Sequence, residues 1–361
     1  MREGDGAPVG ADRRRPDGRR GYARRHAAAR RPTMIDVANE ARVSQTTVSL
    51  VLNHADGARL SQETRERVIK AAARLGYQPG RRVGAPAAAS AASIGFVCDE
   101  ISTDPWTAIG LDGVREKAWE HGLTVTVMVT RGDTEMEAAA FAQLAAQPLL
   151  GLVYATINTR LVETPAALLE RPAVLLNCHA ADGSLPSVVP GEVAGGHAAT
   201  DVLIRAGHRR IGYVNGEASM EASRHRLRGY RQALATADLP FDPDLVGEGN
   251  WQPLSGYEAT LALMALPSPP TAIFCANDLM AVGCYEALRE LGLRIPESVA
   301  VMGYDDREIA QHLHPPLSSV LLPHFEMGSI AAEILIDTAA GSPGRPRQIK
   351  VECPIVRRKS V

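Results

Sequence analysis

Polar side chains and one tryptophan stand just beyond the ends of apolar stretches, in a pattern suited to a polyhydroxylated ligand. Arg226 heads the stretch RLRGY, and Trp251 lies in the loop GEGNWQPLSG. Five more residues directly follow strand-like runs: Asp99 after GFVC, Arg131 after VMVT, Asn177 after VLL, Asn277 after IFCA and Asp305 after VMGY. Carboxylate, amide and guanidinium groups form paired hydrogen bonds with vicinal hydroxyls, and an indole packs against the C–H face of a sugar ring. This set predicts a carbohydrate-like ligand.

Each of these residues also has a structural interpretation. Asp99 and Asp305 could cap strand ends by accepting backbone N–H groups, because buried polar groups usually have structural partners. Trp251 could anchor its loop, and Arg131 and Arg226 could be surface charges. The ligand interpretation rests on all of them meeting in one cleft.

An enzyme that hydrolyses sugars would also present acids, and Asp305 and Asp306 are adjacent. Neighbouring residues of a strand end point to opposite faces, so these two cannot flank one glycosidic bond. The sequence contains no G-x-S-x-G, P-loop or H-E-x-x-H motif. His312 and His314 have no third ligand spaced near them. We expect no enzymatic activity, no cofactor and no metal.

The elements that must position these residues begin at Ile94, where apolar strands alternate with helical stretches. One set runs from SIGFVCDE to ALLERPAVLLN, and a second from HAATDVLIRAGHRRIGYVNG to VAVMGYDD. Continuous apolar strands alternating with helices predict parallel sheets covered on both faces. Two sets predict a two-lobed α/β core whose ligand binds at the carboxyl ends of the strands.

Three short helical patterns precede this core. The first two meet at Arg42-Val43-Ser44, and the third runs from Ser61 to about Leu75, with Gly76 as its stop. Thr33 and Ser44 are suited to capping the first two helices. Each pattern has an inward apolar face: Val37, Ala38 and Ala41; Val48, Val51 and Leu52; Val68, Ala72 and Leu75.

The second helix exposes a face of small polar residues and one leucine: Gln45, Thr46, Ser49 and Leu50. Two short helices joined by a tight turn form a helix-turn-helix, whose second helix can enter a major groove. A small bundle without a nucleic-acid partner would have the same periodicity.

Two sequence segments resemble the DNA-binding headpiece of the lactose-repressor (LacI/GalR) family of bacterial transcription regulators: VSQTTVSLVLN and SQETRERVIKAAARLGYQP. The rest resembles the family's sugar-binding, periplasmic-binding-protein-like core, so the resemblance spans about residues 33–361. It implies a homodimer on a pseudo-palindromic operator and a sugar-like effector between the lobes. The implied DNA contacts are Thr33, Ser44, Gln45, Thr46, Thr47, Ser49, Leu50, Asn53 and Pro86. The implied effector contacts are Asp99, Trp106, Arg131, Asn177, Arg226, Trp251, Asn277 and Asp305.

Two positions depart from the family pattern. Leu50 stands where members most often carry arginine, which can bind guanine through two hydrogen bonds. A leucine can only pack against a thymine methyl or a sugar edge. Pro86 takes the place of the leucine that wedges into the minor groove from the family's hinge helix. Proline disfavours a helix interior but can still act as an apolar wedge.

The resemblance and the composition shifts divide the chain into four parts. Residues 1–31, rich in Arg, Gly and Pro, are expected to be disordered or an over-long reading of the start. Residues 32–78 form the headpiece and 79–93 a Pro/Ala/Gly/Ser hinge linker. Residues 94–361 form the core, and we expect the lobes as follows: an N-lobe of about 94–189 and 321–347, and a C-lobe of about 190–320 and 348–361.

Charge and cysteine content fit this division. Residues 1–90 hold 18 Lys+Arg against 9 Asp+Glu, whereas the remainder holds 21 against 32. A basic front end suits phosphate contacts. The five cysteines are widely spaced and contain no C-x-x-C pair, which favours a reducing cytoplasm. No run of about 18 apolar residues exists, so we expect no membrane partner.

The sequence therefore predicts a dimeric, sequence-specific DNA-binding repressor controlled by a carbohydrate-like effector. No heptad run follows IVRRKSV that would build a coiled-coil tetramer. A sugar receptor without a role on DNA and an effector-independent regulator remain as alternatives.

Overall fold

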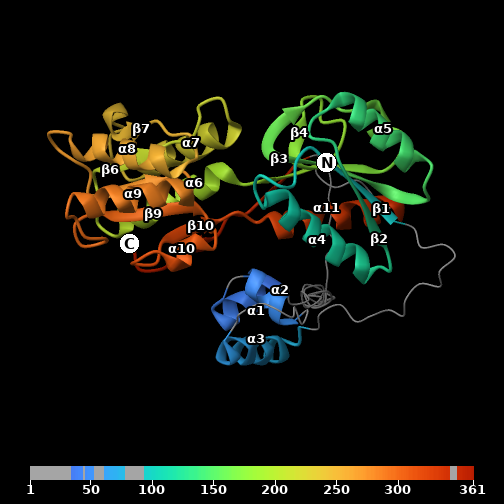
Figure 1. Ribbon diagram of the computed structural model, residues 1–361, viewed down its shortest axis with the longest axis horizontal. Helices are drawn as coiled ribbons and strands as arrows, with labels where there is room; N and C mark the ends of the chain where they lie inside the picture. The colour runs from blue at the N-terminus through green and yellow to red at the C-terminus, as the bar shows by residue number, and fades with distance from the viewer. Residues whose placement is uncertain (1–33, 44, 53–60, 78–92, 342–347) are drawn as a thin grey trace, which may run out of the picture. The chain divides into compact units, whose positions relative to one another are not determined.

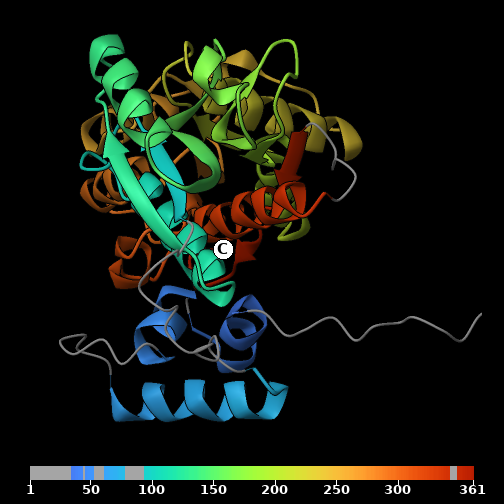
Figure 2. The ribbon, with the colours of Figure 1, turned by 90° about the vertical axis from the view of Figure 1, so that its right-hand side faces the viewer.

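The apolar faces of the three N-terminal helices meet in a small headpiece. The computed structural model describes residues 34–43, 45–52, 61–77, 93–341 and 348–361. Val37, Val48 and Val68, one from each helix, are wholly buried. The helix α3 packs against both other helices (Figure 2). The headpiece helices are α1 (Met34–Ala41), α2 (Gln45–Leu52) and α3 (Gln62–Leu75).

The limits of α3 follow the sequence signals. The Ser61 side chain accepts a hydrogen bond from the backbone N–H of Thr64, and Gly76 adopts a left-handed φ of 69°. The N–H of Tyr77 then bonds the carbonyl of Ala72 at 2.8 Å, which closes the helix end. The predicted start and stop are confirmed. The predicted inward residues are also buried, except Leu52 and Leu75, which are half-buried.

The core folds as two lobes, each built on a six-stranded sheet (Figure 1). In lobe 1 the strand order is β11-β5-β4-β3-β1-β2, and neighbouring strands are parallel. Lobe 1 contains β1 (Ser93–Cys98), α4 (Trp106–Glu120), β2 (Thr124–Val129), α5 (Thr134–Ala145), β3 (Leu149–Val162), η1 (Ala166–Leu168), β4 (Ala173–Ala180), β5 (Ser187–Pro190), α11 (His324–Ala339) and β11 (Gln348–Val351).

Strand β1 is buried along its whole length because helices cover both faces of the sheet. Ile94 and Phe96 pack with Val114 of α4 and Met327 of α11. Val97 points to the other face and packs with residues of α5. A strand placed in this way needs a continuous apolar run rather than alternation, as SIGFVC provides.

Lobe 2 has the strand order β12-β10-β9-β8-β6-β7, in which only the pair β10–β12 is antiparallel. Tyr213, Phe274 and Tyr304 are fully buried at its centre. It contains α6 (Glu192–Arg205), β6 (Ile211–Val214), α7 (Glu221–Thr236), η2 (Pro243–Leu245), β7 (Val246–Gly247), α8 (Pro253–Met264), β8 (Ala272–Cys275), α9 (Asp278–Glu290), β9 (Ala300–Asp305), α10 (Ile309–His312), β10 (Ser318–Leu321) and β12 (Ile355–Val356).

The chain crosses between the lobes after β5, after β10 and after β11. We expected residues 348–361 in the second lobe, and this prediction was wrong for Gln348–Val351. Those four residues pair in parallel with β5 and complete the edge of the first sheet, with Val351 buried. Within the described residues, no helix is long and apolar enough to cross a membrane.

Candidate functional site

Strained backbone marks several of the predicted effector residues. Among the described residues, seven other than glycine have a positive φ. Four of these were predicted effector contacts: Arg131 (53°), Asn177 (58°), Trp251 (68°) and Asp305 (107°). Each such conformation costs of the order of 1–3 kcal/mol and persists only where the surrounding structure enforces it, most often at binding sites. The strain therefore points to a site at these strand ends.

In lobe 2, Arg226 lies at the centre of a buried cluster. Its Nε and Nη2 donate to the two carboxylate oxygens of Glu192, both at 2.8 Å. Its Nη1 donates to the carbonyl of Ala276 at 2.5 Å and faces Asp305 Oδ1 at 3.4 Å. The guanidinium carbon lies 3.7 Å from the ring centroid of Tyr304. The surface-charge interpretation of Arg226 is wrong, because its side chain is only 4% exposed.

Two glycines bring Glu192 and Arg226 together. Helices α6 and α7 pack face to face, and Gly196 and Gly229 stand at their contact. A Cβ on Gly229 would lie 2.3 Å from the carbonyl oxygen of Val193. Without side chains there, the helices approach closely enough for the two charged groups, 34 residues apart, to form a bidentate pair.

Burial sets the protonation chemistry of this cluster. Burial alone would lower the pKa of Arg226, but Glu192 and Asp305 outweigh it and raise that pKa well above its ordinary value. Burial raises the pKa of Asp305 from 3.8 to about 6, against the opposing effect of Arg226 and Arg307. Burial and the nearby Asp305 also raise the pKa of Asp278 well above its ordinary value.

Asn277 and Trp251 are joined through the backbone. Asn277 caps α9 by accepting from the N–H of Met280 at 2.8 Å. Its Nδ2 donates to the carbonyl of Trp251 at 3.0 Å. The Trp251 ring is half-buried, 5.5 Å from the Arg226 guanidinium carbon, and its Nε1 donates to the sulfur of Met220. Asn277 thus positions the tryptophan loop, and Trp251 is both anchored and adjacent to Arg226.

In lobe 1, Asp99 and Asn177 hold the irregular end of β3. Asp99 Oδ1 accepts from the N–H of Ile157 at 2.9 Å, and its Oδ2 pairs with Arg160 at 2.8 Å. Asn177 Nδ2 donates to the carbonyls of Thr156 and Ile157, both at 3.0 Å. The predicted structural alternative, a carboxylate that accepts a backbone N–H, therefore describes Asp99.

Two further predicted residues lie near these. Arg131 is 69% exposed and faces Glu100 at 3.7 Å. Trp106 begins α4, and its ring stacks on His324 with centroids 5.1 Å apart. Burial lowers the pKa of His324 to about 4, so that imidazole is neutral at physiological pH.

The eight predicted residues thus form two groups rather than one. Arg226, Trp251, Asn277 and Asp305 meet in lobe 2. In lobe 1, Asp99 and Arg131 follow β1 and β2. The prediction that Asn177 follows a strand was wrong, because β4 continues to Ala180. Trp106, which begins α4 in lobe 1, contacts the lobe 2 group through Arg307, a residue that was not predicted from the sequence. Its position in the sequence could have marked it as a candidate, because Arg307 directly follows Asp305 and Asp306. No comparable sequence signal marks Glu192.

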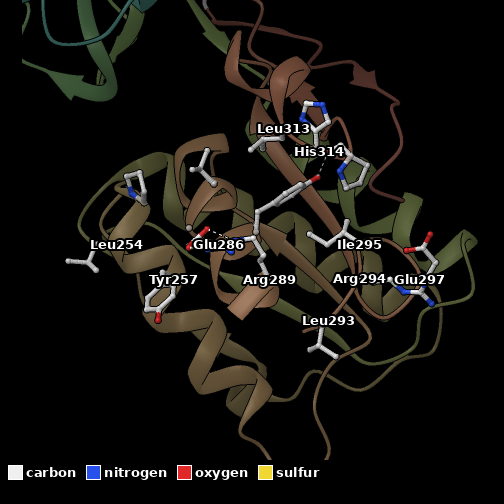
Figure 3. Close-up of a pocket in the computed structure, with 15 residues that line it drawn as sticks. Leu254, Tyr257, Glu286, Arg289, Leu293, Arg294, Ile295, Glu297, Leu313 and His314 are labelled. Carbon is white, nitrogen blue, oxygen red and sulfur yellow. Dashed lines mark hydrogen bonds and ion pairs between the residues drawn. The ribbon is translucent and has the colours of Figure 1, made fainter. Parts of the chain in front are cut away.

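Two cavities of similar volume lie away from the predicted effector residues. One, of about 760 Å³, lies between the lobes and is lined by His179 of β4 and by Glu221 and His225 of α7. His179 Nε2 and a Glu221 carboxylate oxygen are 3.0 Å apart. Its lining includes none of the eight predicted residues. The other, of about 750 Å³, is an open groove on lobe 2 between α8, α9 and residues 293–297 and 313–315, and we call it the outer groove (Figure 3).

The predicted DNA contacts fall mostly outside the described residues. Thr33, Ser44, Asn53 and Pro86 do so entirely, as do residues 1–31 and most of the linker. Five others belong to α2: Gln45, Thr46, Thr47, Ser49 and Leu50. Of these five side chains the structure describes that of Thr47, which is half-buried. The helix begins at Gln45, directly after the predicted cap, and the predicted contacts stay predictions.

A helix-turn-helix headpiece joined to a two-lobed α/β core defines a class of bacterial transcription regulators. Residues 33–80 match the family described as bacterial regulatory proteins, lacI family, and residues 200–361 match the periplasmic binding protein-like domain. The chain is 31% identical to the ribose operon repressor of Haemophilus influenzae, over 91% of this chain and 98% of that one. It is also 31% identical to the repressor CytR of Escherichia coli, over 91% and 96%. The chain therefore belongs to the lacI family.

Solved structures agree with this assignment. A complex of the transcriptional regulator CelR with cellobiose matches with a TM-score of 0.62 and 32% identity, over 92% of this chain and 100% of that one. A Lac repressor dimer bound to operator and the anti-inducer ONPF matches with a TM-score of 0.63 and 28% identity, over 91% and 98%. The predicted fold class is confirmed. The relatives are transcriptional repressors, so the prediction of a regulator rather than an enzyme is also confirmed.

Proposed function

We propose that this protein is a cytoplasmic repressor that binds a pseudo-palindromic operator as a homodimer and responds to a small carbohydrate-like effector held between its lobes. The observation that carries the effector proposal is the strained backbone, since four predicted contacts adopt positive φ. CelR with cellobiose and the Lac repressor with ONPG are relatives bound to sugars or sugar derivatives. Arg226 and Asp305 supply planar hydrogen-bonding groups, and Trp251 supplies the ring face.

The effector acts through the arrangement of the lobes. An effector that binds one arrangement more tightly shifts the population toward it, and only this difference in affinity can change operator occupancy. Asp305 ends β9 of lobe 2, and Asp99 follows β1 of lobe 1. A ligand that contacts both residues therefore favours the arrangement of the lobes in which both contacts can form.

A sugar panel tests the effector. We expect at least one neutral mono- or disaccharide to raise the melting temperature of the full-length protein and to change its affinity for operator. Trp251→Ala should remove the response, whereas Trp119→Ala, at a 42% exposed position of lobe 1, should keep it. If no sugar in the panel shifts the wild-type melting temperature, the carbohydrate proposal fails.

An effector-independent regulator is the second candidate. It is favoured by the internal bonds of the site, because Asp99 pairs with Arg160 and Arg226 pairs with Glu192. Such a protein would bind operator with one affinity in the presence and absence of every sugar, so the same panel decides between the two.

The operator proposal rests on α2 and on charge. The Lys and Arg excess of residues 1–90 suits contacts to DNA phosphates. Gln45 is suited to adenine through its N6 and N7 atoms, and Leu50 to a thymine methyl. Selection of binding sites from a random DNA library would test this, and a lack of palindromic enrichment would contradict it.

The homodimer proposal rests on the outer groove (Figure 3). Leu254 is 66% exposed on its rim, while Val282 and Leu313 line it. Charges of both signs, Glu286 and Arg289, border the same surface. Such a surface can pair with its own copy about a two-fold axis.

Sedimentation velocity tests this surface. Leu254→Asp should give a monomer, whereas Leu169→Asp, at a 58% exposed position of lobe 1, should remain dimeric. A dimeric Leu254→Asp would place the interface elsewhere.

A further inference from the structure

Arg307 joins the two lobes across the cleft. It follows β9 of lobe 2, where its backbone N–H donates to Asp278 Oδ2 at 2.7 Å and its Nε faces Asp305 Oδ2 at 3.4 Å. Its Nη2 donates to the carboxylate of Asp104, which belongs to lobe 1. The side chain is 19% exposed, so these contacts are largely shielded from water.

The same guanidinium covers the indole of Trp106. Its carbon lies 4.8 Å from the ring centroid, within the range of a cation–π contact. Trp106 is therefore held by two planar groups, Arg307 from lobe 2 and His324 at the start of α11. A sugar ring that stacks on the face of Trp106 covered by Arg307 needs the place where this guanidinium lies.

Arg307 also contacts Asp305. One of its oxygens faces Arg226 and the other faces Arg307. A ligand that stacks on Trp106 and donates hydrogen bonds to Asp305 must therefore replace the contacts of Arg307 with each.

We propose that Arg307 is a positioning residue of the effector site, whose guanidinium occupies the effector's place on Trp106 and is displaced when the effector binds. This rests on the proposed function of the cleft. Displacement leaves the carboxylates of Asp104 and Asp305 without one of their cations. The incoming ligand must then supply hydrogen-bond donors and must not be an anion. The site therefore selects neutral or amino sugars and rejects sugar acids and sugar phosphates.

The contact with Trp106 can be tested without any ligand. In full-length Trp119→Phe/Trp251→Phe protein, Trp106 is the one remaining tryptophan of the three. Arg307→Met keeps the length of the side chain but removes the guanidinium, and it should shift the emission of Trp106 to longer wavelength and increase its quenching by acrylamide. Asp104→Asn should act in the same direction. Arg205→Met, which alters a 74% exposed arginine at the end of α6, should change neither value.

Arg307→Lys separates stacking from charge. Lysine keeps the cation but lacks the planar fork, so it should leave Trp106 more exposed to acrylamide than the parent and less than Arg307→Met. Identical quenching in the parent and in Arg307→Met would refute the contact.

Calorimetry on otherwise wild-type protein tests the displacement. With cellobiose, D-ribose, D-glucosamine and D-glucuronate as probes, we expect binding of the neutral or amino sugars only. Arg307→Met should bind the same sugar about tenfold more tightly, because no cation–π contact has to be broken. Weaker binding by Arg307→Met would make Arg307 a direct contact and overturn the proposal, as would binding of glucuronate. If no sugar binds while Arg307→Met still exposes Trp106, the proposed effector fails and the Arg307 contact stands.

Discussion

Removing Arg226 should destabilise lobe 2 more than removing its partner Glu192. The two side chains are 4% and 3% exposed and share two hydrogen bonds of 2.8 Å. Arg226→Met leaves Glu192 and Asp305 as buried acids without their common cation. Breaking a buried pair from one side typically costs about 3–5 kcal/mol, and we expect a loss of this size. Glu192→Gln leaves Arg226 facing Asp305 and the carbonyl of Ala276, so we expect about 1–3 kcal/mol.

The double variant Arg226→Met/Glu192→Leu should recover much of the loss, because an apolar replacement of a buried pair removes the desolvation cost as well as the attraction. The matched control is Arg205→Met/Asp201→Leu on α6, an ion pair whose side chains are 74% and 36% exposed. That pair should contribute less than about 1 kcal/mol.

The loss in Arg226→Met should also depend on pH. Without the arginine, the pKa of Asp305 rises further above its present value of about 6. A carboxyl group whose pKa is raised by folding destabilises the protein only at pH values where the group ionises in the unfolded chain. The deficit of Arg226→Met should therefore be smaller near about pH 5 than near about pH 8.

Urea unfolding followed by far-UV circular dichroism, at both pH values, measures these differences. Losses below about 1 kcal/mol for Arg226→Met would show that the pair contributes no more than an exposed one. A deficit that is larger at the lower pH would contradict the assignment of Asp305 as a buried, reluctantly ionised acid.

Three further predictions concern pH, sequence preference and salt. The contribution of Asp305 is fully present below pH 3.8 and lost as pH rises through about 6. Wild type should therefore lose roughly 3 kcal/mol relative to Asp305→Asn between acid and neutral pH, measured by urea unfolding; a constant difference would contradict this. Leu50→Arg should gain a preference for guanine of about 1–3 kcal/mol at one base pair of the half-site. Half-sites selected with both proteins check it, and identical consensus sequences would show that Leu50 does not reach the groove. Operator binding should weaken steeply with rising salt, because bound cationic side chains displace phosphate counterions. A flat salt titration would refute the phosphate contacts.

Local sequence signals were sufficient to predict the helices and strands. Ser61 and Gly76 bound α3 because an N-cap hydroxyl and a left-handed glycine act within a few residues of chain. The strand-end residues were found for the same reason, since an apolar run ends where the sheet ends. Asp99, Asn277 and Asp305 all lie at or directly after strands.

Pairings over long separations could not be found in this way. Arg307 and Asp104 are 203 residues apart, and Arg226 and Glu192 are 34 apart on different helices. Residue type made Arg226 a candidate ligand contact, but only the packing of α6 on α7 determines that two of its hydrogen bonds go to Glu192. The strand β11 was misassigned for a related reason, because QIKV carries no signal that distinguishes one sheet edge from the other.

These pairings also bear on how an effector could act. Among the described residues, the side-chain contacts that join the lobes include those of Arg307 with Asp104 and of His179 with Glu221. Both lie between groups that carry or can carry charge, so opening the lobes exposes charges that are now paired. An effector that displaces Arg307 replaces one contact and leaves the other in place. The change in operator affinity is then limited by the difference between the ligand's contacts and those of Arg307, rather than by the total strength of effector binding.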